Sequence, residues 1–407
     1  MIISFRFKNS RSFFDETLMS MEAVSYREHP EHLVPLLNRK LLKTLAVYGS
    51  NASGKSNLLL SLASFHTYIY NQLFTMKQIQ RDSTLSFLHI LPQGQITPFW
   101  NSAEENFPTE MELCFINQGH LFEYGFTILN QQILTENLTM DHHLVFSRER
   151  THIFPGRTYE KRLRIGADVS VRSNCLFCTI LACMDQPDIT AVMVPFEDYF
   201  FRGIQYHLDF SNPLNFMETT DLPGIPQFPD DNSDSEATAF ALNHLNKLGI
   251  APNVSPDNLG STPARYRIRS HTTGKELFYQ ASMNTLSNGT LKYISLFRHI
   301  YELQKIGGTL VIDNISDHFH PNVTKYIVDL VQNESNSKMQ LIFTTYDTAI
   351  LNNRQFRRDE VAFVDMNEYH ESRLYTLADI KVRSDASFSK DYLLGKYGAI
   401  PMIRQEL

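Results

Sequence analysis

Apolar and polar residues alternate along five stretches of the chain, and this period of two predicts half-buried β-strands. The first two stretches, residues 2–13 (IISFRFKNSRSF) and 18–24 (LMSMEAV), predict an opening β-meander. The other three are separated only by NQG and LN turns, so they predict antiparallel neighbours in one sheet. They are residues 109–116, 120–129 and 131–140.

A second pattern, in which short apolar runs alternate with helical periodicity, predicts a parallel sheet covered by helices. Residues 41–70 have the pattern of a buried strand, a Gly/Ser-rich turn and a helix. Residues 286–367 continue it with two helices and three strands. The predicted helices are 286–305 and 320–333, and the predicted strands are 307–314, 338–347 and 361–367.

Between these parts, apolar residues at helical spacing in 174–207 and 233–249 predict a helical insertion, the second helix capped by Asp234 or Ser235 and stopped by Gly249. Residues 212–234 are rich in proline and acid, which predicts an exposed loop. We therefore expect an α/β protein with three regions. These are residues 1–140, a β and helical insertion at 141–260, and residues 261–407.

Composition restricts the class of protein. A chain of 407 residues is longer than a single core usually supports. It has no run of 18 apolar residues to span a bilayer, and its first residues carry charges that a signal peptide would lack, so we expect a cytoplasmic protein without membrane contact. Four cysteines do not suggest a disulfide framework, and CLFCTILAC at 175–183 is expected to be buried helix rather than a zinc site.

The net charge of −7 argues against a surface coated in positive potential. A local basic strip from Arg148 to Arg172 is the best candidate for contact with nucleic acid. Its alternating segments FSRERTHIF and YEKRLRI favour two strands with one exposed face over a DNA track.

Residues 49–56, GSNASGKS, match the motif GxxxxGKS in full and lie between a predicted strand and a predicted helix. Glycine at both ends lets the backbone curl so that its N–H groups face an anion, while Lys55 reaches the β- and γ-phosphates and Ser56 ligates Mg²⁺. The predicted ATP-binding residues of this loop are Gly49, Ser50, Asn51, Ala52, Ser53, Gly54, Lys55, Ser56 and Asn57.

Two further features complete the predicted site. Asp313 ends an apolar strand, where a parallel sheet places an acid that holds Mg²⁺, although an exposed acid at a strand end is about as common. The segment LSNGT at 286–290 precedes a predicted helix and offers a second anion grip. The segment resembles the signature of ATP-binding cassettes, and this resemblance implies that Ser287, Asn288 and Gly289 hold the γ-phosphate of ATP bound by another copy, in a head-to-tail pair.

These motifs resemble those of ATP-binding-cassette ATPases related to SMC and RecF proteins, a bacterial family often classed as AAA ATPases and found in abortive-infection and other phage-defence loci. The resemblance implies an ATPase head in which residues 1–140 and 261–407 form two lobes and two heads dimerise around Mg-ATP. The segments that carry it are FKNSRSFFDE, GSNASGKSNLL, MELCFINQGHLFEYGF, LSNGT, IDNISDHFHP, QLIFTTYDTAIL and YLLGKYGAIP.

Two positions depart from the family pattern. The glutamate that normally follows the magnesium-binding aspartate is Asn314, and the histidine of the switch strand is Tyr346. An amide cannot take a proton at neutral pH, so general-base help worth about 100- to 10,000-fold in rate should be missing. Both changes affect hydrolysis, and the binding residues are retained.

The resemblance implies a defence ATPase, or a defective one, that scaffolds or restrains a separately encoded effector such as a nuclease or toxin. Two alternatives remain open at this point. One is a RecF-like clamp that binds DNA or senses its ends, which would need a basic inner face. The other is an ordinary hydrolase whose base comes from a partner subunit.

Overall fold

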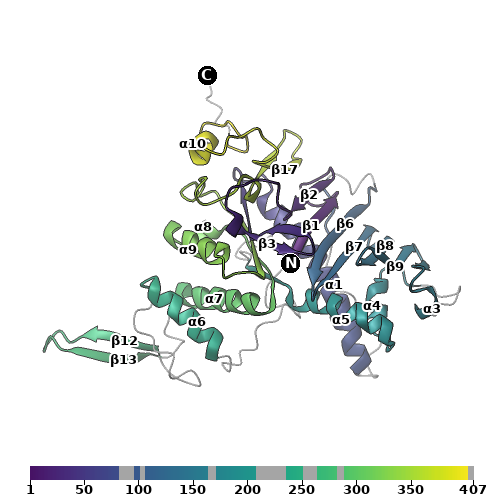
Figure 1. The fold of residues 1–407 in the computed structure, drawn as a ribbon, viewed down its shortest axis with the longest axis horizontal. Helices are drawn as coiled ribbons and strands as arrows, with labels where there is room; N and C mark the ends of the chain where they lie inside the picture. Colours follow the sequence, from purple (N-terminus) through teal and green to yellow (C-terminus); the bar gives the residue numbers. More distant parts are fainter. Residues whose placement is uncertain are drawn as a thin grey trace.

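Two β-sheets that pack against helix α1 (Lys55–Arg81) form the body of the protein, as the computed structural model shows (Figure 1). Side chains of α1 share one core with residues of both sheets, which explains why residues 58–73 of this helix are buried on every side, polar side chains included. The structure describes residues 1–81, 96–100, 106–163, 171–207, 235–250, 264–281 and 288–401. No helix in these ranges is both long and apolar enough to cross a bilayer.

The first sheet is antiparallel and has seven strands in the order β10-β9-β8-β7-β6-β1-β2. This sheet confirms the strands predicted from alternation. It also includes β9 and β10, which lie beyond the region boundary expected at residue 140. Its strands are β1 (Ile2–Lys8), β2 (Thr17–Ser20), β6 (Thr109–Asn117), β7 (His120–Leu129), β8 (Gln132–Met140), β9 (His143–Glu149) and β10 (His152–Pro155).

The second sheet has the order β11-β14-β15-β5-β16-β17 and is parallel except at β17. The carboxyl ends of β5, β14 and β15 therefore meet at one edge, where parallel sheets bind their ligands. Its strands are β5 (Thr44–Tyr48), β11 (Ile204–His207), β14 (Gly308–Ile312), β15 (Met339–Thr344), β16 (Val361–Met366) and β17 (Ser372–Thr376). The described residues form an α/β fold in which β5, the loop after it and α1 make a strand–loop–helix unit.

Further helices lie beside the sheets (Figure 1). Gly249, with φ +70°, follows α6 and confirms the predicted stop. The remaining helices are α3 (Glu160–Leu163), α4 (Phe177–Leu181), α5 (Pro187–Arg202), α6 (Ser235–Lys247), α7 (Asn288–Ile306), α8 (Ile315–His318), α9 (Pro321–Gln332), α10 (Phe388–Leu393) and the short 3-10 helices η1 (Pro30–His32) and η4 (Arg358–Glu360).

The described residues also contain two hairpins that the pattern of apolar and polar residues did not predict. β3 (Leu33–Leu36) pairs with β4 (Arg39–Leu42) beside the first sheet. β12 (Ala264–Arg269) pairs with β13 (Glu276–Ala281) and projects from the body of the protein (Figure 1). The predicted linker at 212–234 lies outside the described residues.

The basic strip from Arg148 to Arg172 is only partly as predicted. Its first half forms β9 and β10, but YEKRLRI contains the short helix α3 instead of a strand. Arg148 is buried and donates to Cys175 O at 2.5 Å and Arg172 O at 2.9 Å. This arginine therefore holds the interior together and offers no charge to DNA. Cys175 and Cys178 are buried at α4, as predicted.

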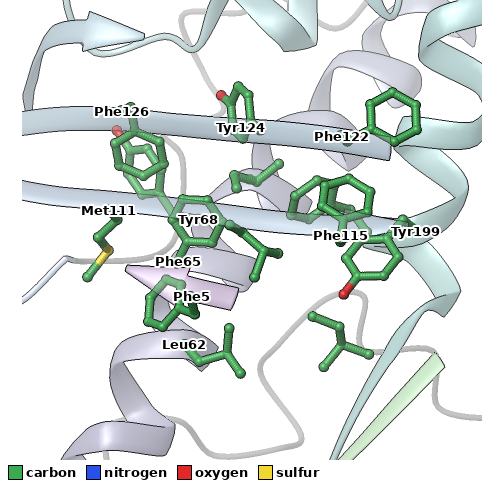
Figure 2. Packing of buried hydrophobic residues seen from close by; sticks show 14 of the residues in the cluster. Phe5, Leu62, Phe65, Tyr68, Met111, Phe115, Phe122, Tyr124, Phe126 and Tyr199 are labelled. Carbon is green, nitrogen blue, oxygen red and sulfur yellow. The ribbon is translucent and has the colours of Figure 1, made fainter. Parts of the chain in front are cut away.

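Aromatic side chains fill the core between α1 and the first sheet (Figure 2). Phe65 of α1 stacks on Phe126 of β7 with ring centroids 5.3 Å apart, and Phe115 of β6 stacks on Tyr199 of α5 at 3.9 Å. Such rings bury large apolar areas and fix the position of the helix along the face of the sheet. The start of α1, where the loop that is predicted to bind phosphate ends, is thereby fixed.

Histidine 66, inside this core, should make the protein less stable in mild acid. Its Nε2 donates to Phe200 O at 2.8 Å, and burial lowers the pKa of His66 to about 4. An unfolded histidine titrates near its ordinary value of 6.5, so the stability linked to the neutral ring is complete above that pH and is lost as the pH falls towards 4. Between pH 7.5 and pH 5 this site should cost about 2 kcal/mol.

Urea unfolding of wild type and His66→Phe at these two pH values checks the expectation. The loss of stability on acidification should be about 2 kcal/mol smaller in the variant. His152→Phe, on an exposed position of β10, serves as the matched control. Equal acid sensitivity of wild type and His66→Phe would contradict the assignment.

Candidate functional site

The loop between β5 and α1 is shaped by close packing around its two glycines. A Cβ atom on Gly49 would collide with Val364 O of β16, and one on Gly54 would collide with Ser372 Oγ of β17. Gly54 also has φ +105°, which L-residues with side chains rarely adopt. The motif glycines are therefore required by neighbours that lie more than 300 residues away.

Two serines outside the motif, Ser12 and Ser372, form hydrogen bonds that support the loop. Ser372 Oγ donates to Ser53 O at 2.7 Å, and it shares a second hydrogen bond, of 2.8 Å, with Ser12 Oγ. Asn57 Nδ2 in the first turn of α1 donates to the same Ser12 Oγ at 2.9 Å. Ser12, in the turn between β1 and β2, and Ser372 of β17 thus fasten the loop through hydrogen bonds that no local motif reveals.

Lys55 lies at the start of α1 with its ammonium group over the loop. Its Nζ donates to Gly49 O at 2.8 Å and to Ser50 O at 2.7 Å. Burial lowers the pKa of Lys55, and the nearby Asp313 carboxylate acts in the opposite direction. The lysine therefore carries its charge between the loop and the end of β14, where a phosphate group would need it.

Asp313 is buried directly after β14, close to Lys55 as predicted. Thr344 Oγ1, at the end of β15, donates to Asp313 Oδ1 at 2.5 Å and accepts from Asn314 N at 2.7 Å. The parallel pairing of β14 with β15 creates this contact. Sequence reasoning placed Thr344 in the switch strand but did not give it this role.

Asn314 and Tyr346, the two positions that depart from the family pattern, lie close to this threonine in the chain or in space. Asn314 caps α8 in the left-handed conformation, φ 50° and ψ 53°, which asparagine tolerates better than most residues. Tyr346 follows β15 and is 48% exposed, while Thr345 before it is buried and bonds Ser316 Oγ. His320 Nδ1 accepts from Asn322 N at 3.2 Å, so this histidine caps α9.

The predicted second anion grip is described only in part. Asn288 and Gly289 form the first turn of α7, whereas Ser287 lies outside the described residues. The assignment of these three residues to a partner's γ-phosphate stays a prediction.

A cavity of about 700 Å³ opens over the loop and is the candidate nucleotide site. Its floor is the loop from Ala52 to Asn57, and Ser56 is exposed there. Its walls include Trp100, which is 58% exposed, and Tyr369, which is 69% exposed. Exposed aromatic faces next to a phosphate-binding loop provide surfaces on which a nucleobase stacks. Met366 and His370 complete the lining.

The turn between β16 and β17 holds Tyr369 at the edge of this cavity. Asn367 Oδ1 accepts from Tyr369 N at 2.9 Å and from Glu371 N at 2.9 Å, and its Nδ2 donates to Glu371 Oε2 at 2.6 Å. The tyrosine is therefore presented by an ordered turn. No motif pointed to Trp100 or Tyr369, because what brings them to the loop is tertiary structure.

A larger cavity, of about 1,040 Å³, lies between β2 and β17 and is unsuited to a nucleotide. Its lining includes the acids Asp15, Asp365 and Asp379. These carboxylates would repel phosphate, and no glycine-rich loop lines this cavity. The smaller cavity over Lys55 therefore fits Mg-ATP better. Ser56 lines it, and Asp313 lies near Lys55 outside the lining, so both oxygens are of the kind that Mg²⁺ prefers.

A family model described as "AAA domain, putative AbiEii toxin, Type IV TA system" matches residues 220–352. The matched segment contains LSNGT, Asp313 and the switch strand. This confirms the resemblance to AAA ATPases related to abortive-infection systems. No curated protein matches the chain.

Solved structures of SMC heads match over most of their length. An SMC head bound to the C-winged helix domain of ScpA is 12% identical, with 96% of this chain and 99% of that chain covered and a TM-score of 0.37. The Thermotoga maritima SMC head domain is also 12% identical, with coverage of 92% and 98% and a TM-score of 0.36. A head with an extended coiled coil, bound to the C-terminal domain of ScpA from Pyrococcus furiosus, is 12% identical, with coverage of 97% and 98% and a TM-score of 0.37.

Proposed function

We propose that this chain, an SMC-like AAA ATPase related to abortive-infection systems, binds Mg-ATP at the loop around Lys55 and hydrolyses it slowly. One observation supports the proposal above all. The loop, the Lys55 ammonium and the Asp313 carboxylate converge at one edge of the parallel sheet, while the residue after Asp313 has no group that accepts a proton.

The binding residues have separate tasks. The N–H groups of the loop and the start of α1 face the phosphates, and Lys55 exchanges its bonds to Gly49 O and Ser50 O for phosphate oxygens. Ser56 and Asp313 would hold Mg²⁺, which neutralises phosphate charge when bound. Thr344 keeps the Asp313 carboxylate oriented by donating to Oδ1.

Slow hydrolysis follows from the two residues that depart from the family pattern. The Asn314 amide can orient a water molecule through hydrogen bonds, but it cannot take the proton that the attacking water loses. Tyr346 can donate a hydrogen bond, although its phenol lies farther from the backbone than an imidazole would. ATP should therefore remain bound for long periods.

Two copies are proposed to close head to tail around ATP, with Ser287, Asn288 and Gly289 of one chain completing the site of the other. Such closure would act as a latch, because ATP selects the closed arrangement over the open one. Sedimentation velocity with and without Mg-ATP tests this. Wild type should dimerise only with nucleotide, and Ser287→Arg should bind ATP but stay monomeric. If wild type sediments in the same way with and without Mg-ATP, the proposed head-to-tail dimer around ATP is rejected.

The latch is proposed to scaffold or restrain a separately encoded effector, such as a nuclease or toxin, in antiphage defence. The family description that matches residues 220–352 names a putative toxin of a toxin–antitoxin system, which supports a protein partner. The RecF-like DNA clamp stays an alternative: Arg148 of the basic strip is buried, whereas Arg150, Arg157, Lys161 and Arg172 are exposed. DNA affinity that falls steeply with salt would favour that alternative.

Nucleotide binding should be visible in the intrinsic fluorescence of the protein. Trp100 is the chain's single tryptophan and it lines the cavity over Lys55. If the base stacks there, Mg-ATP should quench this fluorescence, and Tyr369→Ala should weaken binding about 5- to 100-fold, the range measured for base stacking on aromatic side chains.

Tyr369→Phe keeps the aromatic face and is the matched control, so it should bind almost as well as wild type. An equal loss of affinity in both variants would indicate that the hydroxyl matters and not the ring. Unchanged affinity in Tyr369→Ala would remove Tyr369 from the site.

A further inference from the structure

Three donor side chains converge at the 3-10 turn η1, on the sequence EHPEH. His29 Nδ1 lies 3.0 Å from Glu31 Oε1, and His32 Nε2 lies 3.7 Å from the same oxygen. The three donor atoms all lie within 4.8 Å of one another. In the described part of the chain, no other group of three or more His, Cys, Asp or Glu side chains converges in this way.

These distances match the needs of a small divalent metal. Zinc binds imidazole nitrogen and carboxylate oxygen at about 2.0–2.2 Å in tetrahedral sites, so neighbouring ligand atoms lie about 3.3 Å apart. The two contacts to Glu31 lie on either side of that value. Small side-chain rotations would therefore bring all three donors to one ion.

The other nitrogen of each ring already has an oxygen partner from a distant part of the chain. His32 Nδ1 bonds Glu360 Oε2 at 2.8 Å, and His29 Nε2 donates to Asn353 O at 2.9 Å. Metal-binding histidines almost always have such a partner, because it sets the tautomer and orients the ring towards the ion.

The backbone of one donor is already fixed, whereas the rings still have to turn. The rings stack with centroids 4.6 Å apart, so one of them must tilt before both nitrogens face a single ion. His29 adopts the left-handed conformation with φ 43°. A histidine in that region is under strain, which persists only when the surroundings hold it there. His32 is buried, whereas the side chains of His29 and Glu31 are 22% and 37% exposed, so the site opens to solvent on one side.

We infer that His29, Glu31 and His32 form a zinc site, with a fourth position left to water. The site lies where residues 24–32 meet residues 353–360. Arg358 Nε bonds Glu28 Oε1 at 3.0 Å there, and Val24 N donates to Asp359 Oδ2 at 2.8 Å. Zinc would brace this junction between the N-terminal segment and the start of β16, the strand that contacts the ATP-binding loop at Val364.

The test measures metal content and stability of the full-length protein. After dialysis against micromolar zinc and gel filtration, wild type should retain about one zinc ion per chain by mass spectrometry of the metal, and removal with a chelator should lower the melting temperature. Co²⁺ in place of zinc should give visible absorption bands of a tetrahedral site. Stoichiometry below about 0.1, with no shift in melting temperature, would overturn the inference.

Two variants at exposed donors keep the test independent of folding. Glu31→Gln and His29→Asn should each weaken zinc binding at least about tenfold, and asparagine tolerates the left-handed backbone at position 29. His143→Asn, on an exposed position of β9, is the matched control and should bind zinc like wild type. Equal zinc binding by all three variants would place the metal elsewhere and reject the site.

Discussion

Replacing Asn314 with glutamate should raise the steady-state rate of ATP hydrolysis about 100- to 10,000-fold, the usual contribution of a general base. The position follows Asp313 at the carboxyl end of β14, and its backbone N–H is held by Thr344 Oγ1 at 2.7 Å. A carboxylate at this place can take the proton of the attacking water. Phosphate release under saturating Mg-ATP measures the effect.

Asn314→Gln is the matched control, because it lengthens the side chain but keeps the amide. It should hydrolyse ATP as slowly as wild type. Glutamate adopts the left-handed conformation at this position less readily than asparagine. The substitution should therefore lower the free energy of unfolding by about 1 kcal/mol without affecting the proton transfer. Fast turnover by wild type, or equal rates in wild type and Asn314→Glu, would show that the proton goes elsewhere.

Replacing Glu136 with alanine should lower the free energy of unfolding by about 3–5 kcal/mol, as expected when one partner of a buried ion pair is removed. Its carboxylate is fully buried and accepts from Phe177 N at 2.7 Å, Cys178 N at 2.9 Å, Tyr124 Oη at 3.0 Å and Arg148 Nη1 at 3.3 Å. Burial raises the pKa of Glu136, and these donors act in the opposite direction. The variant leaves the Arg148 guanidinium and the start of α4 without this acceptor.

Urea unfolding followed by far-UV circular dichroism gives the difference directly. Glu149→Ala, on an exposed position of β9, is the control and should change stability by less than about 0.5 kcal/mol. A loss below about 1 kcal/mol in Glu136→Ala would mean that α4 docks on the sheet through its apolar side chains alone.

The elements with a strong period were predictable from the sequence. Strict alternation gave the antiparallel strands from Thr109 to Met140, and the apolar run before GSNASGKS gave β5. Elements whose partners lie far along the chain were missed. β11 is a short apolar strand at the end of a helical stretch, and its pairing with β14 decides its conformation.

The prediction for YEKRLRI failed because its charges were assigned to an exposed strand face. Arg148, in the same basic strip, shows the physical reason such patterns mislead. A single arginine satisfied by Glu136 and three carbonyl groups is stable inside the protein, and a one-dimensional pattern cannot show those partners.

The candidate site divides in the same way. Lys55, Asp313 and the two degenerate positions follow from local motifs. Ser12 and Ser372, which brace the loop, and Trp100 and Tyr369, which line the cavity, come together only in the folded chain. The resemblance to SMC-like ATPases predicts the role of the loop but does not predict which residues surround it.

Isothermal titration calorimetry with Mg-ATP, on wild type and on Lys55→Ala, tests most directly whether the loop binds a triphosphate. We expect wild type to bind one ATP per chain only when magnesium is present, and the variant to bind about 10- to 100-fold more weakly, as the loss of a hydrogen bond to a charged group predicts. The absence of binding heat in wild type, or equal affinity in the variant, would contradict the account.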